Sequence, residues 1–292
     1  MRIRVVLVLA VLAVLALPAG PVAAVPTCMG VPATIWGTEG PDTLTGTVGD
    51  DVIQGSGGND LIYGGFGNDL ICGGDGDDWI LGEDDNDALW GDAGNDTLLG
   101  GPGTDRLHGG DGNDVLDQGL GATSVSEGEA GNDLIRLGRV EQYDEHNVWG
   151  GPGRDTLDLR YVPVGGDSVG VHILMEQSGY NLFLGNCPPP GWHCWTAVMP
   201  SGLVSSIEVI YGTQGNDNLE GNASRNVLYG LGGRDYLRGG GARDRLVGGA
   251  GGDRLEGGDG DDRLKGGAGT DQVDGGAGVD TCAGETKTAC EL

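Results

Sequence analysis

Aliphatic residues return at every ninth position along two long stretches of the chain. When each nonapeptide is numbered from its first glycine, as in 64–72 (GGFGNDLIC), position 8 is leucine or isoleucine in all nine units of 37–117. Positions 7 and 9 vary, and a second run of eight units occupies 212–283. Because neighbouring strand residues point to opposite faces, this pattern predicts a three-residue strand whose middle side chain is buried.

The other six positions of the unit are rich in glycine and predict a turn. Glycines at positions 1, 2 and 4 allow positive φ angles that other residues resist. We expect two units to form one turn of a solenoid, so that residues eighteen positions apart stack at the strand spacing of about 4.8 Å. The sequence therefore predicts an all-β fold, a parallel β-roll (β-helix solenoid), whose two repeat runs are separated by degenerate repeats and a β insert.

Position 6 is almost always aspartate, so the stacking predicts columns of carboxylates. Such columns would repel, or raise their own pKa values, unless cations lie between successive members. Calcium suits this role better than magnesium, because it accepts six to eight oxygen ligands in a flexible geometry that turn carbonyl groups can complete. The candidate calcium ligands are Asp42, Asp51, Asp60, Asp69, Asp78, Asp87, Asp96, Asp105, Asp114, Asp133, Asp155, Asp217, Asp235, Asp244, Asp253, Asp262, Asp271 and Asp280.

The unit Gly-Gly-x-Gly-x-Asp-x-aliphatic-x resembles the calcium-binding repeat of the RTX (repeats-in-toxin, hemolysin-type) proteins, and the overall layout resembles their small secreted bacterial members. This resemblance implies a parallel β-roll with Ca²⁺ in its turns. The chain departs from the family pattern at Asp85 and Ala242, which replace the glycine of position 4, and at Asn226, which replaces the aspartate. The resemblance therefore predicts weak or empty sites in those turns.

Binding and folding are expected to be one event. Each nonapeptide buries about one aliphatic side chain, worth roughly 1.5 to 3 kcal/mol. Ordering its nine residues costs on the order of 1 to 2 kcal/mol of backbone entropy apiece. We therefore expect the metal-free chain to be largely unfolded and multiple Ca²⁺ ions to drive formation of the roll.

The segments outside the two runs predict an exported protein. Residues 1–24 combine basic residues, a short apolar run and small residues, which is typical of a secretory signal peptide and too short to span a bilayer. We expect a secreted, extracellular protein whose mature chain has no membrane span. The other expected segments are an N-terminal cap (25–36), degenerate repeats (118–158, with single units at 128–136 and 150–158), a β insert (159–211) and a C-terminal cap (284–292).

The cysteines predict disulfide bonds, and the net charge indicates which binding partners are favoured. Six cysteines in an exported chain favour disulfides over zinc, and short loops suggest Cys187–Cys194 and Cys282–Cys290, leaving Cys28 to pair with Cys72. The formal net charge of −28 disfavours anionic partners and favours cations. The arginines of the second run lack the interleaved aromatic residues of a nucleic-acid site, so no nucleic-acid partner is expected.

The sequence offers little support for catalysis. Residues 166–170 match the Gly-x-Ser-x-Gly pattern of serine hydrolases, but without the strand, elbow and helix that this motif needs. No His-Glu-x-x-His motif occurs, and a lone histidine in a degenerate turn, His146, is expected to be a polar surface residue rather than a metal ligand. We therefore expect no enzymatic activity.

One alternative function uses the insert. Trp192 and Trp195 flank Cys194 in 159–211, so the protein could be a calcium-dependent adhesin or ligand-binding protein with a cell-surface or glycan partner. An ice-binding face would need a regular outward ladder of threonine or asparagine, and we expect none at positions 5 and 7. The leading hypothesis is a secreted calcium-binding protein.

Overall fold

The computed structural model describes residues 25–120, 125–138, 145–162, 171–174, 182–184 and 207–290. Its elements are all β-strands, with no helix among these residues. No helix of the described part has the length and apolarity needed to cross a bilayer. The signal peptide expected at 1–24 lies outside the described residues.

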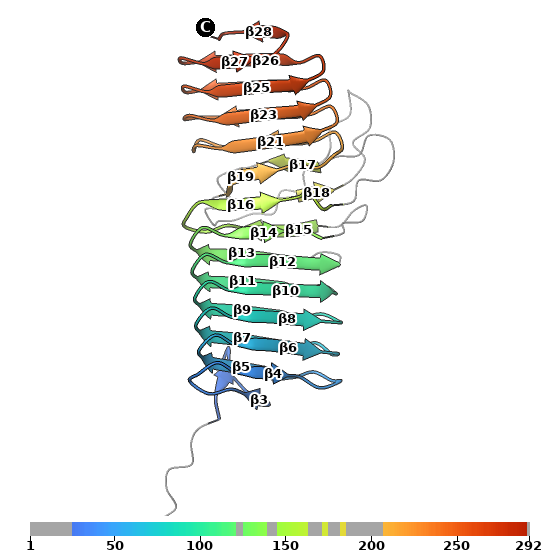
Figure 1. Ribbon diagram of the computed structural model, residues 1–292, viewed down its shortest axis with the longest axis vertical. Helices are drawn as coiled ribbons and strands as arrows, with labels where there is room; N and C mark the ends of the chain where they lie inside the picture. The colour runs from blue at the N-terminus through green and yellow to red at the C-terminus, as the bar shows by residue number, and fades with distance from the viewer. Residues whose placement is uncertain are drawn as a thin grey trace, which may run out of the picture.

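Two sheets run the length of the molecule, and the chain alternates between them (Figure 1). The first sheet is 12-stranded and contains, in spatial order, β4 (Thr43–Thr45), β6 (Leu61–Gly65), β8 (Trp79–Glu83), β10 (Thr97–Pro102), β12 (Val115–Leu120), β14 (Leu134–Arg136), β16 (Asp155–Asp158), β19 (Ile207–Tyr211), β21 (Val227–Gly232), β23 (Arg245–Ala250), β25 (Arg263–Ala268) and β27 (Thr281–Ala283). The second is 14-stranded and contains β3 (Ile35–Trp36), β5 (Val52–Gly57), β7 (Leu70–Asp75), β9 (Ala88–Ala93), β11 (Arg106–Asp111), β13 (Val125–Ala130), β15 (Glu145–Trp149), β18 (Leu182–Leu184), β17 (Val171–Leu174), β20 (Asn218–Glu220), β22 (Tyr236–Gly240), β24 (Arg254–Asp259), β26 (Gln272–Ala277) and β28 (Thr286–Thr288).

Pairing within the repeat runs is parallel and in register. Leu98 of β10 lies opposite Leu116 of β12, and Leu246 of β23 lies opposite Leu264 of β25. Each strand thus pairs with the strand two units away, as a two-unit coil requires. The predicted parallel β-roll is confirmed.

The strands are longer than the three residues predicted. β5 to β13 are mostly six-residue strands that continue from positions 7 to 9 of one unit into positions 1 to 3 of the next. The backbone at the glycine-rich positions pairs across coils, as between Ser56 and Gly74, so those residues extend the ladder rather than form a turn. Only positions 4 to 6 turn the chain.

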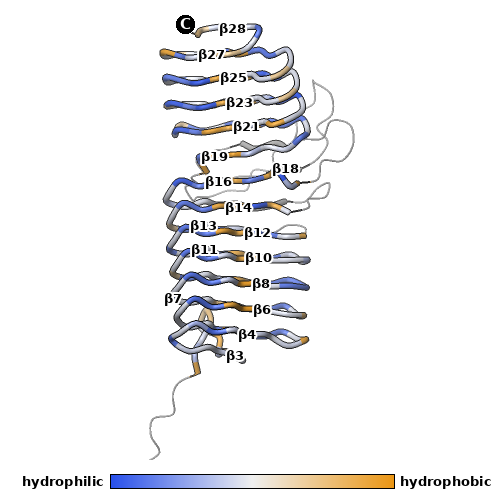
Figure 2. The backbone as a smooth tube through the Cα atoms, in the orientation of Figure 1, coloured by the Kyte–Doolittle hydropathy of each residue, from blue (hydrophilic) through white to orange (hydrophobic). Residues whose placement is uncertain are grey.

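The position-8 side chains form the core between the two sheets. Ile53, Ile62, Leu98 and Leu107 are among a continuous row that is fully buried. In Figure 2 the rungs change from hydrophilic at their edges to hydrophobic within the strands. The row is interrupted in the degenerate unit 119–127, where Ser126 is buried and accepts a hydrogen bond of 2.8 Å from Gln118.

The described strands of the 159–211 segment join both sheets. β17 and β18 form an antiparallel hairpin that lies between β15 and β20 in the second sheet. β19 pairs with β16 and β21 and keeps the first sheet continuous. The loop with Trp192 and Trp195, on which the adhesin alternative depends, lies outside the described residues, as do residues 166–170.

Two disulfides close the ends of the roll. Cys28 of β1 (Thr27–Cys28), which pairs with β2 (Val31–Pro32), is bonded to Cys72, and Cys282 is bonded to Cys290. Both predicted pairs are confirmed. The predicted Cys187–Cys194 pair lies outside the described residues.

Candidate metal centre

The predicted aspartates form two columns, one at the start of the strands of each sheet. Residues of the first column precede or begin strands of the 12-stranded sheet: Asp42, Asp60, Asp78, Asp96, Asp114, Asp133 and Asp155, and beyond the insert Asn226, Asp244, Asp262 and Asp280. Residues of the second column precede strands of the 14-stranded sheet: Asp51, Asp69, Asp87 and Asp105, and later Asp217, Asp235, Asp253 and Asp271. Asp42 is half-buried, and all the others are buried.

One oxygen of each carboxylate links successive coils. The backbone N–H of Asp78 donates to Oδ1 of Asp96 over 2.7 Å, and the N–H of Asp96 donates in turn to Oδ1 of Asp114 over 2.8 Å. The same bond recurs along both columns, including the irregular spacings from Asp114 to Asp133 and from Asp133 to Asp155. The hydrogen-bonded column therefore continues where the spacing between aspartates departs from 18 residues.

The second oxygen of most column carboxylates has no hydrogen-bond partner. Buried Oδ2 atoms without a partner belong to Asp60, Asp69, Asp78, Asp87, Asp96, Asp105, Asp114, Asp133, Asp235, Asp244, Asp253, Asp262 and Asp271. A buried oxygen of a carboxylate without a donor is costly, since its solvation is lost and nothing replaces it. Such a row of oxygens calls for a positively charged partner.

The first aspartates of the runs differ, because a threonine at position 2 supplies donors. Oδ2 of Asp42 accepts bonds from the N–H and the hydroxyl of Thr38. Thr47 donates its N–H to Asp51, and Thr213 donates its N–H to Asp217. The unpartnered oxygens therefore belong to the interior coils rather than to these first members.

The glycine at position 1 keeps space beside each Oδ2 atom. A Cβ atom on Gly64 would lie 2.6 Å from Oδ2 of Asp69 and 2.5 Å from the carbonyl oxygen of Gly82 in the next coil. The expectation that this glycine provides positive φ is wrong, because positive φ occurs at positions 2 and 4, as in Gly65 and Gly67. Position 1 is glycine because a carboxylate oxygen and a carbonyl oxygen converge there.

Burial raises the pKa of many interior column carboxylates in the metal-free molecule. The pKa rises to about 7 for Asp87 and Asp96 and to about 8 for Asp235. Loss of solvation is the largest cause, the backbone hydrogen bond opposes it, and repulsion from column neighbours adds to it. Ionised columns are thus unfavourable at neutral pH without a cation.

The columns fit calcium by their chemistry. They offer carboxylate oxygens with carbonyl oxygens of position-1 glycines beside them, and these hard oxygen ligands are those that Ca²⁺ prefers. None of the column residues named above carries the thiolate or imidazole ligands typical of zinc sites.

The departures from the repeat are accommodated in different ways. Asp85 and Ala242 adopt positive φ angles of 79° and 63°, so they keep the turn at a cost in backbone strain. Asn226 is fully buried in the first column and donates its N–H to Oδ1 of Asp244. A neutral amide can therefore occupy a column position.

Two glutamates extend the columns and were missed from the sequence. Glu208 accepts a bond of 2.8 Å from the N–H of Asp155, and the pairing of Val209 with Val227 places it beside Asn226. Glu285 accepts a bond of 2.8 Å from the N–H of Asp271. Their spacings of 53 and 14 residues from those partners carry no repeat signal.

A second ladder, at position 5, was also missed. Asn113 donates its N–H and side-chain amide to Oδ1 of Asn95, and Asn132 donates in the same way to Asn113. The expectation that position 5 carries no regular asparagine or threonine ladder overlooked these bonds, although Asp50 and Asp77 interrupt the asparagines. Because these amides bond to one another, the ladder fastens adjacent coils at the edge of the roll.

Comparison with known proteins agrees with the geometry. The model of the RTX calcium-binding nonapeptide repeat (4 copies) matches residues 36–71, 73–98, 90–125, 211–246 and 247–282, more than half of the chain. No match was found among curated proteins. Repeats of this family bind calcium, and the matched segments contain both runs of aspartate columns. The chain therefore belongs to the family of RTX calcium-binding nonapeptide repeat proteins.

Proposed function

We propose that this is a secreted protein whose β-roll folds when several Ca²⁺ ions bind along the two aspartate columns. The observation that carries the proposal is the row of buried, unpartnered Oδ2 atoms in the interior coils. Each would serve as a ligand, together with carbonyl oxygens of the adjacent turns. Calcium, when bound, supplies the positive charge that keeps these carboxylates ionised inside the roll.

Coupling between binding and folding follows from how the columns are built. The carboxylates of one column come from different coils, so they lie together only after the coils have stacked. In the unfolded chain each aspartate is solvated and separate. An ion that binds only the stacked form stabilises it by RT ln(1 + [L]/Kd), about 1.4 kcal/mol per site at tenfold excess.

Secretion is supported by the disulfides and by the N-terminal composition. Two disulfides close the described ends of the roll, and such bonds persist in oxidising compartments. The role we propose is binding and structure rather than catalysis. Expression followed by assay of the culture medium, with N-terminal sequencing of the released chain, tests both export and processing.

The direct test is a calcium titration followed by far-ultraviolet circular dichroism. We expect a cooperative transition from coil to β-structure with Ca²⁺ and none with Mg²⁺ at the same concentration, because Mg²⁺ demands a tighter octahedron and sheds water reluctantly. A β spectrum that is already complete in excess chelator would refute calcium-coupled folding.

A further inference from the structure

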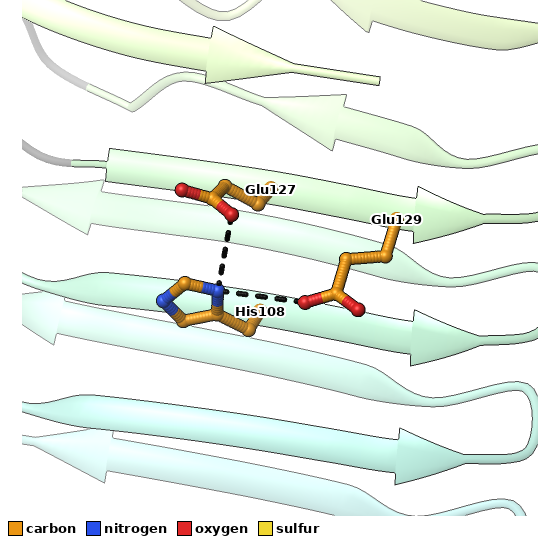
Figure 3. Close-up of side chains that lie close together, drawn as sticks. All are labelled: His108, Glu127 and Glu129. Carbon is orange, nitrogen blue, oxygen red and sulfur yellow. Dashed lines mark ion pairs between the residues drawn. The ribbon is translucent and has the colours of Figure 1, made fainter. Parts of the chain in front are cut away.

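Three side chains on the outward face of the second sheet form a cluster that the calcium columns do not use. His108 lies in β11, and Glu127 and Glu129 lie in the adjacent strand β13 (Figure 3). Nδ1 of His108 is 3.4 Å from Oε2 of Glu127 and 3.7 Å from Oε1 of Glu129. One ligand atom from each of the three residues lies within 4.8 Å of the others.

The imidazole is held in place by its neighbours. His108 pairs in register with Trp90 on one side and Glu127 on the other. Its ring stacks on Trp90 with centroids 4.8 Å apart and planes 3° from parallel. The side chain of His108 is only 18% exposed. Nδ1 is therefore directed at the two carboxylates by packing rather than by chance.

Glu129 occupies a position where the repeat favours glycine. It stands at position 2 of its unit with a φ of 70°, whereas its cross-strand neighbour Gly110 has a φ of 110°. L-residues adopt this conformation only at a cost, and strained positions of this kind cluster at functional sites. The side chain at this position brings a second carboxylate to 3.7 Å from Nδ1 of His108.

The spacing suits a small divalent transition metal. A tetrahedral zinc ion with ligands at about 2.0 to 2.1 Å has neighbouring ligand atoms roughly 3.4 Å apart. The distances of 3.4 and 3.7 Å from Nδ1 require only small side-chain adjustments to meet that value. One imidazole nitrogen with two carboxylates is a ligand set for zinc-class ions, whereas calcium takes oxygen ligands only.

We propose that His108, Glu127 and Glu129 bind one divalent transition metal of the zinc class, at a site separate from the calcium columns. The three residues supply three ligands, and the fourth position faces solvent and is open to water or to an external ligand. Because the ligands come from two coils, the site exists only in the folded roll. The rival explanation is an ion pair between His108 and the glutamates that binds no metal.

The test compares Zn²⁺ binding in the wild type and three variants of the full chain, each kept in saturating Ca²⁺ so that the columns are filled. Glu129→Gly restores the glycine of the repeat and removes one ligand without threatening the fold. Glu83→Gly is the matched control, since Glu83 also stands at position 2 with positive φ (74°), but in β8 of the other sheet. Glu127→Gln is a second ligand variant that leaves the backbone unchanged.

Isothermal titration calorimetry with Zn²⁺ should detect one high-affinity site in the wild type. In Glu129→Gly this site should be lost or bind Zn²⁺ at least tenfold more weakly. Glu127→Gln should lose the same site, and Glu83→Gly should behave as the wild type. Co²⁺ should quench the tryptophan fluorescence of the wild type. The quenching should be smaller in Trp90→Phe, because Trp90 stacks on the proposed ligand His108. Equal stoichiometry and affinity in wild type and Glu129→Gly would overturn the proposal in favour of the metal-free ion pair.

Discussion

Replacing Asp96 by asparagine is expected to stabilise the metal-free roll and destabilise the calcium-loaded roll. Asp96 is 1% exposed, and its pKa rises to about 7 from 3.8, chiefly because of burial. A carboxylate whose pKa is raised by folding destabilises the folded state progressively as the pH rises above the unfolded value, and by the full amount once the pH exceeds the folded value. At pH 8 the penalty is roughly 4 kcal/mol, at about 1.4 kcal/mol per pKa unit. Asparagine removes the charge and retains Oδ1 as acceptor for the N–H of Asp78.

Calcium reverses the sign because Asp96 lies between two column neighbours, Asp78 and Asp114. If the substitution abolishes the site on each side, the variant loses the contribution of two ions. At a thousandfold excess over Kd each ion contributes about 4.1 kcal/mol, so the loss is roughly 8 kcal/mol. Subtracting the gain of roughly 4 kcal/mol leaves the variant about 4 kcal/mol less stable than the wild type. The two effects should cancel near a thirtyfold excess of calcium.

The assay is urea unfolding followed by far-ultraviolet circular dichroism at pH 8. One series contains chelator with an osmolyte that populates the fold, and the other contains increasing calcium. Asp77→Asn is the control, because Asp77 is exposed at position 5 and the same ladder carries asparagine at Asn59 and Asn95. It removes the same charge and should show no reversal. A change of the same sign for Asp96→Asn with and without calcium would refute the reasoning.

Three further predictions follow from the same structure. In chelator, the folded fraction measured by circular dichroism should rise as the pH falls from 8 to 5, because column pKa values of about 6 to about 8 exceed the unfolded value of 3.8. With calcium present, protons compete with Ca²⁺ for the carboxylates, so the calcium concentration at the folding midpoint should increase at low pH. Removing the Cys28–Cys72 bond, which spans 44 residues, should cost about 4 kcal/mol in urea unfolding, and removing Cys282–Cys290, which spans 8 residues, should cost less. Leu98→Ala should cost about 2 to 5 kcal/mol, whereas Leu99→Ala, on the outward face of the same strand, should cost much less; equal losses would contradict the assigned core.

The repeat period was sufficient to predict the fold. An aliphatic residue at every ninth position, with variable neighbours, fixes which side chain points inward, and Leu98 and Leu116 indeed lie opposite each other in the core. The aspartate columns follow from the same arithmetic, since every position of the unit stacks on its equivalent two units away. Periodicity therefore predicts what each side chain faces wherever the period is intact.

Features that depend on backbone pairing could not be predicted from the pattern. The ladder extends through position 1, and the glycine there is required by the oxygen atoms of the next coil rather than by its own φ. A one-dimensional pattern marks that position as glycine but gives no reason for it. Likewise, His108 and Glu127 are 19 residues apart across an irregular unit, and only the register of β11 with β13 brings them together.

Several residues that depart from the repeat lie at the ends of the aspartate columns and replace the hydrogen-bond partners that are missing there. An interior aspartate receives an N–H bond from the preceding coil and donates its own N–H to the next, so a first or last member lacks one neighbour. Thr38, Thr47 and Thr213 supply donors to the first members, and Glu285 accepts from the last aspartate of the second column. At the insert, Glu208 reaches the N–H of Asp155 from the strand that resumes the first sheet. The hydrogen-bonded column is thus completed by side chains at its breaks, which leaves the interior Oδ2 atoms as the positions where a cation, or a proton in its absence, can supply the missing interaction.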